Sequence, residues 1–172
     1  MKKEYVKCIV VLTCICLVAA VLLAVTNFFT SPVIAANKEA AVKASLQEVI
    51  PGGSFEELDL PENAPGTVKA FYRETSGKGY VAVLSTVSQY SNGDMGITAA
   101  IDDEGAISSI AITSYFESKE FGRTTYPQKY YGATAETVDT VDVFAGATYS
   151  STAFRNALAD ALAVYGTVKG GD

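Results

Sequence analysis

Apolar residues gather near the N-terminus of the chain. Eighteen residues run from Cys8 to Val25 with Thr13 as the only conventional polar side chain, and no charge appears between Lys7 and Lys38. At about 1.5 Å per helical residue this run spans about 27 Å, close to the roughly 30 Å hydrocarbon core of a bilayer. The pattern predicts a transmembrane helix over residues 8–30.

A second helical pattern follows directly. Thr30, Ser31 and Pro32 are typical of a helix start, with a hydroxyl cap and proline in the first turn. The residues after them are rich in Ala, Lys and Glu, and the Pro-Gly-Gly run at 51–53 ends the pattern. One apolar stripe recurs at helical spacing and comprises Val42, Leu46, Val49 and Ile50. We therefore expect a stalk helix within residues 31–53 that docks on the domain.

The remainder, residues 54–172, has the pattern of a compact domain. Residues 54–66 are acidic and contain prolines, which predicts a loop. Strand-like runs follow at 67–73, 80–87, 96–101 and 106–113, with a hairpin turn at 102–105. A final amphipathic helix is expected over 151–165, ended by Gly166. The predicted fold class is α+β, a mostly antiparallel sheet packed with helices and preceded by one transmembrane helix.

Composition excludes several kinds of chemistry. The chain has no His, which removes His-dependent triads and the common zinc sites. All three Cys residues lie in the apolar run, so no thiol remains elsewhere for metals, disulfides or nucleophilic chemistry. We expect neither a metal site nor catalytic residues. The net charge of −6 also argues against a nucleic-acid partner.

The seven-residue leader predicts an orientation. It carries three Lys and one Glu, so the cytoplasmic preference of basic residues places it inside the cell and the domain outside. The rest of the chain then has 10 basic and 18 acidic residues, a net charge of −8. A cleaved secretory signal, with Ala35 and Ala36 at the cleavage region, is the alternative. The apolar run exceeds the usual signal core of about 7–15 residues, which favours an uncleaved membrane anchor.

The segment 142–151, DVFAGATYSS, carries the candidate chemistry. Gly146 permits a tight turn, Ala145 and Ala147 leave room for a ligand, and Thr148 brings a hydroxyl to the start of the last helix. A helix N-terminus suits a phosphate group, although the dipole contributes only about 0.3–1 kcal/mol. An ordinary helix cap by Thr148 or Ser150 explains the same spacing.

This segment resembles the flavinylation pattern D-x-x-S/T-G-A-T of the FMN-binding domain family. That family includes the G component of the Rnf electron-transport complex and the C component of the sodium-translocating NADH:quinone oxidoreductase. Asp142, Gly146, Ala147 and Thr148 match the pattern, whereas Ala145 replaces its usual Ser or Thr. The LQEVIPGG run at 46–53, GKGY at 77–80 and the hairpin IDDEGAISSIAI at 101–112 also look like the Rnf G component.

The resemblance implies a covalent cofactor. In that family the threonine hydroxyl is joined to the ribityl phosphate of FMN by a phosphoester that a separate flavin transferase makes. This places FMN on Thr148, with Asp142 orienting the loop and helping the transferase bind. The remaining cofactor-binding residues that we predict are Gly146, Ala147, Ser150, Ser151, Glu117, Ser118, Tyr115 and Phe121.

The aromatic-rich segment 115–131 is the predicted slot for the flavin ring. Tyr115, Phe121 and Tyr126 are stacking candidates, and core aromatics sealing a loop are the alternative. Relatives often carry E-T-P-G-L-G in this segment, whereas this chain has ESKEFG at 117–122, where only Glu117, Ser118 and Gly122 align.

The expected function is that of a single-pass membrane flavoprotein subunit. It relays electrons among the other membrane subunits of an ion-translocating Rnf-type complex, with membrane lipid around its anchor and no catalysis of its own. A cofactor-free anchored binding or assembly module is one alternative. A stand-alone extracellular flavin shuttle is another.

Overall fold

The computed structural model describes residues 2–89, 93–116 and 125–170. The chain divides into two compact units, Met1–Ala41 and Val42–Asp172. The predicted site residues Glu117, Ser118 and Phe121 lie outside the described residues.

Helix α1, Lys2–Val49, supplies the whole first unit. Among the described residues it is the one helix long and apolar enough to cross a membrane, and the most apolar part of it is unburied. Its large side chains, such as Leu12 at 64% and Leu23 at 71%, remain exposed to the surroundings. Because exposed apolar surface of this extent is unfavourable in water, it fits contact with lipid.

The predicted helix start at Thr30 is wrong. Helix α1 continues through Pro32, and the hydroxyl of Thr30 donates to the carbonyl of Thr26 at 2.9 Å within the same helix. A proline removes one intrahelical hydrogen bond. The helix-forming residues on both sides nevertheless continue the same helix.

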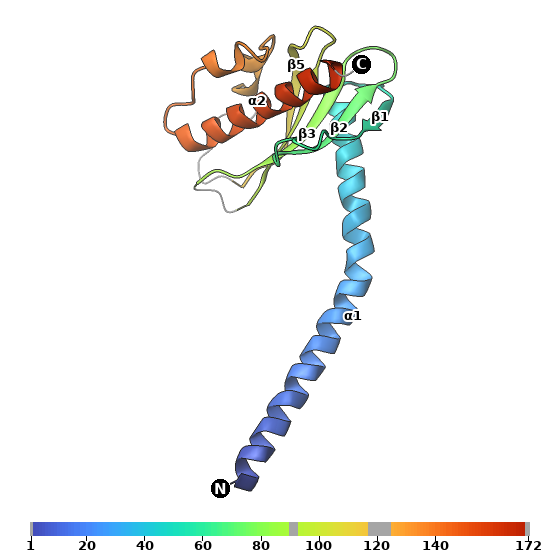
Figure 1. The fold of residues 1–172 in the computed structure, drawn as a ribbon, viewed down its shortest axis with the longest axis vertical. Coiled ribbons are helices and arrows are strands. Elements are labelled where there is room, and N and C mark those ends of the chain that lie inside the picture. The colour runs from blue at the N-terminus through green and yellow to red at the C-terminus, as the bar shows by residue number, and fades with distance from the viewer. Residues whose placement is uncertain (1, 90–92, 117–124, 171–172) are drawn as a thin grey trace. The chain divides into compact units, whose positions relative to one another are not determined.

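The second unit contains one five-stranded sheet (Figure 1). Its strands are β1 Phe55–Leu58, β2 Val68–Glu74, β3 Tyr80–Thr86, β4 Met95–Ile101 and β5 Ile107–Ser114. They pair in chain order, and every pairing is antiparallel. The four predicted strand runs correspond to β2–β5, and the predicted turn at 102–105 joins β4 to β5.

The sheet buries both faces, because its strands alternate between two apolar clusters. The cross-strand row Phe71, Ala82, Ala99 and Ile110 lies in the larger cluster with helix α2, Thr148–Gly170. Residues on the other face, including Val81, Ala100 and Ala111, pack with the end of α1. That end contributes Leu46 and Val49, and Ile50 follows directly after it, as the apolar stripe predicted, with Val42 partly buried beside them.

Helix α2 crosses one face of the sheet and contacts β2, β3 and β4 (Figure 1). It begins three residues before the predicted start and continues past Gly166 to Gly170. Near its C-terminal end the Tyr165 hydroxyl donates to the carbonyl of Asp103 at 2.8 Å, and Lys169 donates to the same carbonyl. These contacts join the last turns of α2 to the β4–β5 turn. The α+β fold class is confirmed.

Two parts of the fold were not predicted. Strand β1 lies within residues expected to form a loop. Between β5 and α2 the described chain contains two short 3-10 helices, η1 Pro127–Tyr130 and η2 Val138–Thr140. Both precede the segment that carries the candidate chemistry.

Candidate flavin site

The candidate segment forms a loop from η2 to the first turn of α2. We call residues 139–148 the acceptor loop. Gly146 turns it with φ +87°, a left-handed conformation that L residues rarely adopt. After this turn Ala147 N–H donates to the carbonyl of Phe144 at 3.1 Å, and α2 begins at Thr148. The predicted role of Gly146 in a tight turn is therefore confirmed.

Ser151 connects this loop to the helix. Its side chain is fully buried, and its hydroxyl accepts a hydrogen bond from Phe144 N–H at 3.0 Å. The same hydroxyl lies 2.9 Å from the carbonyl of Ala147 and 3.1 Å from that of Thr148, to which it can donate. All of these partners belong to the loop or the first turn. Ser151 thus fixes the backbone that leads into Thr148.

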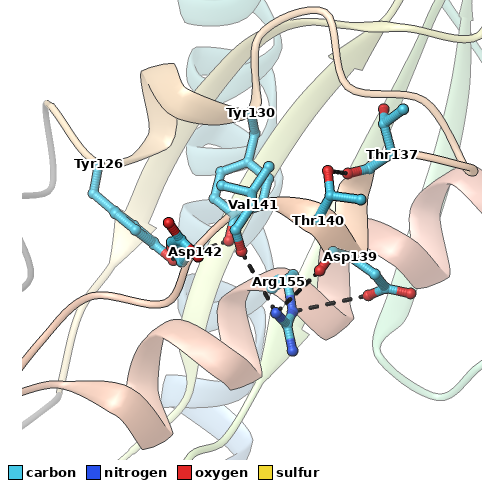
Figure 2. A network of polar contacts seen from close by, with 8 residues as sticks. All are labelled: Tyr126, Tyr130, Thr137, Asp139, Thr140, Val141, Asp142 and Arg155. Carbon is cyan, nitrogen blue, oxygen red and sulfur yellow. Dashed lines mark hydrogen bonds and ion pairs between the residues drawn. The ribbon is translucent and has the colours of Figure 1, made fainter.

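Two buried tyrosines support the loop at Asp142. The Tyr126 hydroxyl donates to the carbonyl of Asp142 at 3.1 Å and lies 2.9 Å from the Tyr130 hydroxyl (Figure 2). Burial is the main cause that raises the pKa of Tyr130 above its ordinary range, and the hydrogen bond with Tyr126 adds to it. The Tyr130 phenol therefore stays protonated near neutral pH and remains available as a donor.

Arg155, two turns into α2, binds the start of the loop. Its guanidinium donates to the carbonyls of Asp139 at 3.4 Å and Val141 at 3.5 Å, and its Nε lies 3.8 Å from the Asp139 carboxylate. Figure 2 shows that this one side chain makes all three contacts. The arginine is 24% exposed, whereas Asp139 is 72% exposed. Arg155 therefore joins the loop to the helix at a second place.

The beginning of α2 lacks a capping side chain at its N-cap. Ala147 holds the N-cap position, since its carbonyl accepts the first helical hydrogen bond from Ser151 N–H at 2.9 Å. A methyl group cannot accept a hydrogen bond, and the first turn contains no acidic residue. A cap by the hydroxyl of Thr148 is therefore not the arrangement found. An uncapped helix N-terminus is chemically suited to an anion such as a phosphate.

Thr148 is the first helical residue and is exposed. Within the described parts of the chain its hydroxyl has no hydrogen-bond partner. Asp142 is exposed as well, whereas Ser150 is 6% exposed. The loop therefore presents a threonine hydroxyl and a carboxylate to the surroundings on a backbone fixed from its buried side.

An open groove of about 850 Å³ has Thr148 in its lining. Its walls come from α2 between Thr148 and Asp160 and from residues 86–89 at the end of β3, together with Thr67 and Asp139. The apolar lining includes Val87, Tyr149, Ala153 and Ala159, and the polar lining includes Gln89, Thr152 and Asn156. Ligand sites of about 300–1,000 Å³ with an apolar wall and a few polar groups are typical for cofactors. The groove has the size of a flavin site, and its lining combines these apolar side chains with amides, hydroxyls and the carboxylates of Asp139 and Asp160.

The predicted ring slot is only partly described. Tyr126 is 1% exposed and packs edge-on against Tyr130 and Phe144, with Phe154 also in ring contact. It is a core residue, so the prediction that it stacks on a flavin is wrong. Tyr115 is partly buried against the main apolar cluster. The predictions for Glu117, Ser118 and Phe121 fall outside the described residues.

Several residues at the site were not predicted from the sequence. Arg155 looks like a solvent-facing charge on an amphipathic helix, and its partners are mostly backbone carbonyls, which leave no sequence signal. Val87 lies at the end of a strand pattern and far from the acceptor motif. Its side chain is 60% exposed, and only the fold shows that it lines the groove.

Comparisons with known families agree with this geometry. The profile of the FMN-binding domain matches residues 91–163, which include the acceptor loop and the first turns of α2. The profile of the RnfG N-terminal region matches residues 1–49, the extent of α1. The chain belongs to the FMN-binding domain family and is of the RnfG type. A comparison with curated proteins finds no match.

Family membership sets the biological context of this RnfG-type protein. It is a flavin-binding Rnf subunit, and RnfG membership implies a place in a multi-subunit Rnf complex. The apolar helix α1 fits a single-pass membrane protein. FMN is the cofactor that the matched domain supports.

Proposed function

We propose that this RnfG-type protein holds FMN as a phosphoester on Thr148 and relays electrons within an ion-translocating Rnf-type complex. The observation that carries this proposal is the exposed hydroxyl of Thr148, without a partner among the described residues, at a helix N-terminus where Ala147 holds the N-cap position. The loop behind it is fixed by Tyr126, Ser151 and Arg155. A modifying enzyme therefore meets the acceptor in a defined position.

The attachment is the work of a separate flavin transferase in this proposal. The bond from Thr148 Oγ1 to phosphorus forms while a phosphoanhydride bond of an activated flavin nucleotide breaks, and the leaving nucleotide departs. The hydroxyl proton passes to a base on the transferase, since the chain has no His and no thiol outside its apolar run. The exposed carboxylate of Asp142 supplies a recognition point for that enzyme. Ala147, Gly146 and Ser150 shape the space around the phosphate.

The bound FMN supplies reversible two-electron redox chemistry, and the protein positions it. Covalent attachment has a physical advantage outside the cytoplasm, because a cofactor held at micromolar affinity, about −8 kcal/mol, would be lost by dilution. The domain itself needs no acid–base catalysis. Its partners in the relay are the other membrane subunits of the complex.

The orientation follows from the charges that flank the apolar helix. Lys2, Lys3 and Lys7 precede the apolar run, with Glu4 as the one acidic residue among them. Basic residues flanking a span favour the cytoplasmic side. We therefore place the domain outside the cytoplasm and the anchor, uncleaved, in membrane lipid.

Flavin fluorescence tests this proposal. The full chain is co-expressed with a flavin transferase, denatured and run on a gel, where covalent flavin stays with the protein. Thr148→Ala should be dark. Thr152→Ala is the matched control, since Thr152 lines the same groove one turn further along α2, and it should fluoresce like the unmodified chain. Fluorescence that persists in Thr148→Ala would refute the assignment of the acceptor.

A second outcome distinguishes the cofactor-free alternative. Intact mass measured after co-expression should exceed that of the polypeptide by the mass of one FMN less one water. A mass equal to the polypeptide alone would favour an anchored module without a cofactor.

A further inference from the structure

We infer that the tricyclic flavin ring lies in the groove against Tyr149 and Val87, on the β3 side of the site, an inference that rests on the proposed attachment at Thr148. The groove is lined by residues of α2, by residues 86–89 and by Thr67 and Asp139, and Thr148 is itself part of this lining. A ring tethered by its side chain at Thr148 can therefore lie in the groove.

The exposure of two apolar side chains supports this placement. Tyr149 is 55% exposed and Val87 is 60% exposed, and both line the groove. Large exposed apolar groups that share one hollow are typical of ligand walls, whereas isolated exposed ones are ordinary surface. Tyr149 directly follows the proposed acceptor along the helix. Its phenol ring offers an aromatic surface for offset or edge contact with a flat ligand.

The groove also offers polar partners suited to the edge of a flavin. The side-chain amides of Gln89 and Asn156 are exposed within its lining, and each can both donate and accept a hydrogen bond. The hydroxyl of Thr152 lies in the same wall. A ring system with an apolar benzenoid end and a polar pyrimidine end needs both kinds of surface.

The buried tyrosines that support the acceptor loop do not offer such a surface. Tyr126 and Tyr130 are 1% and 0% exposed and are occupied by ring contacts with Phe154. A flavin could reach either one only by displacing part of the core. Among the described aromatic residues, Tyr149 lines the groove and is 55% exposed.

Fluorescence of the native protein tests this inference. A tyrosine ring in contact with an excited flavin quenches its emission by electron transfer, so the native holoprotein should be dimmer than the same sample unfolded. In Tyr149→Leu the native-to-unfolded emission ratio should rise several-fold, because the aromatic ring that quenches the emission is lost. Tyr131→Leu is the matched control, because Tyr131 is 45% exposed and is not part of the groove lining.

A second variant reports on the apolar wall. Val87→Ser should weaken the vibronic fine structure of the visible flavin band, which sharpens in apolar surroundings, whereas Tyr131→Leu should leave it unchanged. Both altered side chains are exposed, so the fold should be retained, as far-ultraviolet circular dichroism can verify.

The outcomes separate this inference from the proposed function. Unfolded wild-type protein without flavin emission would overturn both. Flavin present in the unfolded chain, with native emission and band shape unaffected by Tyr149→Leu and Val87→Ser, would overturn the placement of the ring alone. A rise in emission in Tyr131→Leu instead would place the ring near Tyr131, outside the groove lining, and would equally overturn it.

Discussion

The hydroxyl of Tyr126 donates to the backbone carbonyl of Asp142 at 3.1 Å, from a ring that is 1% exposed. A core side chain thus holds the backbone of the first residue of the acceptor motif. The carboxylate of Asp142 is left at the surface. Support from the core and exposure at the surface are therefore combined at one residue.

Tyr126→Phe should destabilise the domain and loosen the acceptor loop. The substitution keeps the ring contacts but removes the donor to Asp142 and leaves the buried Tyr130 hydroxyl without this partner. The expected loss is about 1–2 kcal/mol in the free energy of unfolding. Urea denaturation of the detergent-solubilised protein measures it. A variant as stable as the wild type would show that the hydrogen bond makes no net contribution.

Arg155→Met should slow flavin attachment more than it changes stability. The variant keeps much of the aliphatic volume but loses the donors to the carbonyls of Asp139 and Val141. Because these contacts are long, we expect about 1 kcal/mol of destabilisation and a several-fold slower incorporation of flavin by the transferase. Time-resolved gel fluorescence measures the rate. Arg73→Met, at an exposed arginine of β2, is the control and should incorporate flavin at the wild-type rate.

Gly146→Ala should strain the turn before Thr148. No atom would lie within 4 Å of the added Cβ, so crowding is not the cost. The backbone at φ +87° is unfavourable for an L residue by roughly 1–2 kcal/mol. We expect lower stability by that amount and reduced flavin incorporation. Gly132→Ala, at φ +81° with equally open surroundings, is the control: it should match the stability loss and leave incorporation intact.

Glu74 should give the stability of the domain an acid dependence. The pKa of Glu74 is lowered below its ordinary 4.5, mainly by a hydrogen bond from the Ser76 hydroxyl and then by one from Lys78 N–H. A depressed folded-state pKa contributes stability above the unfolded value, and that contribution is lost as pH falls through the folded value.

Glu74→Gln therefore should be less stable than wild type at neutral pH, and the difference should shrink steadily below pH 4.5. Denaturant titrations across the acid range measure this. A difference that stays constant with pH would show that the ionised carboxylate is not its source.

Asp160→Asn should raise the midpoint potential of the attached flavin. Asp160 lines the groove and accepts a hydrogen bond from the Thr67 hydroxyl, which an asparagine oxygen can also accept. A nearby negative charge disfavours the addition of electrons. Since the site is open and screened, a shift of about 10–20 mV is expected for the two-electron couple. Spectroelectrochemistry at low and high salt measures it, and the shift should be smaller at high salt.

Local patterns predicted most of the elements. Short strand-like runs placed β2–β5, and the Asp-Asp-Glu-Gly turn at 102–105 placed the hairpin between β4 and β5. Strand β1 escaped prediction because four residues with two exposed glutamates, at Glu56 and Glu57, carry too short a pattern, and backbone pairing with β2 defines it. Pro32 led to a wrong prediction for the opposite reason. Its local pattern indicated a helix start, but helix-forming residues on both sides continue one helix through it.

The site was predictable in its motif and unpredictable in its surroundings. Residues close together in the chain, such as Gly146 and Thr148, indicate a turn followed by a helix. The contacts of Tyr126 and Arg155 with loop carbonyls join residues 14–16 positions apart, and carbonyls are the same in every residue. The flavin-stacking role predicted for Tyr126 could be rejected only once its burial was known.

Helix α2 is secured at both ends, by Ser151 and Arg155 near its start and by Tyr165 and Lys169 against Asp103 near its finish. These contacts oppose movement of α2 along its axis. A flavin esterified at the N-terminal end of α2 would consequently keep a fixed position within the domain. Any larger movement needed to reach successive electron-transfer partners would have to be a movement of the whole domain.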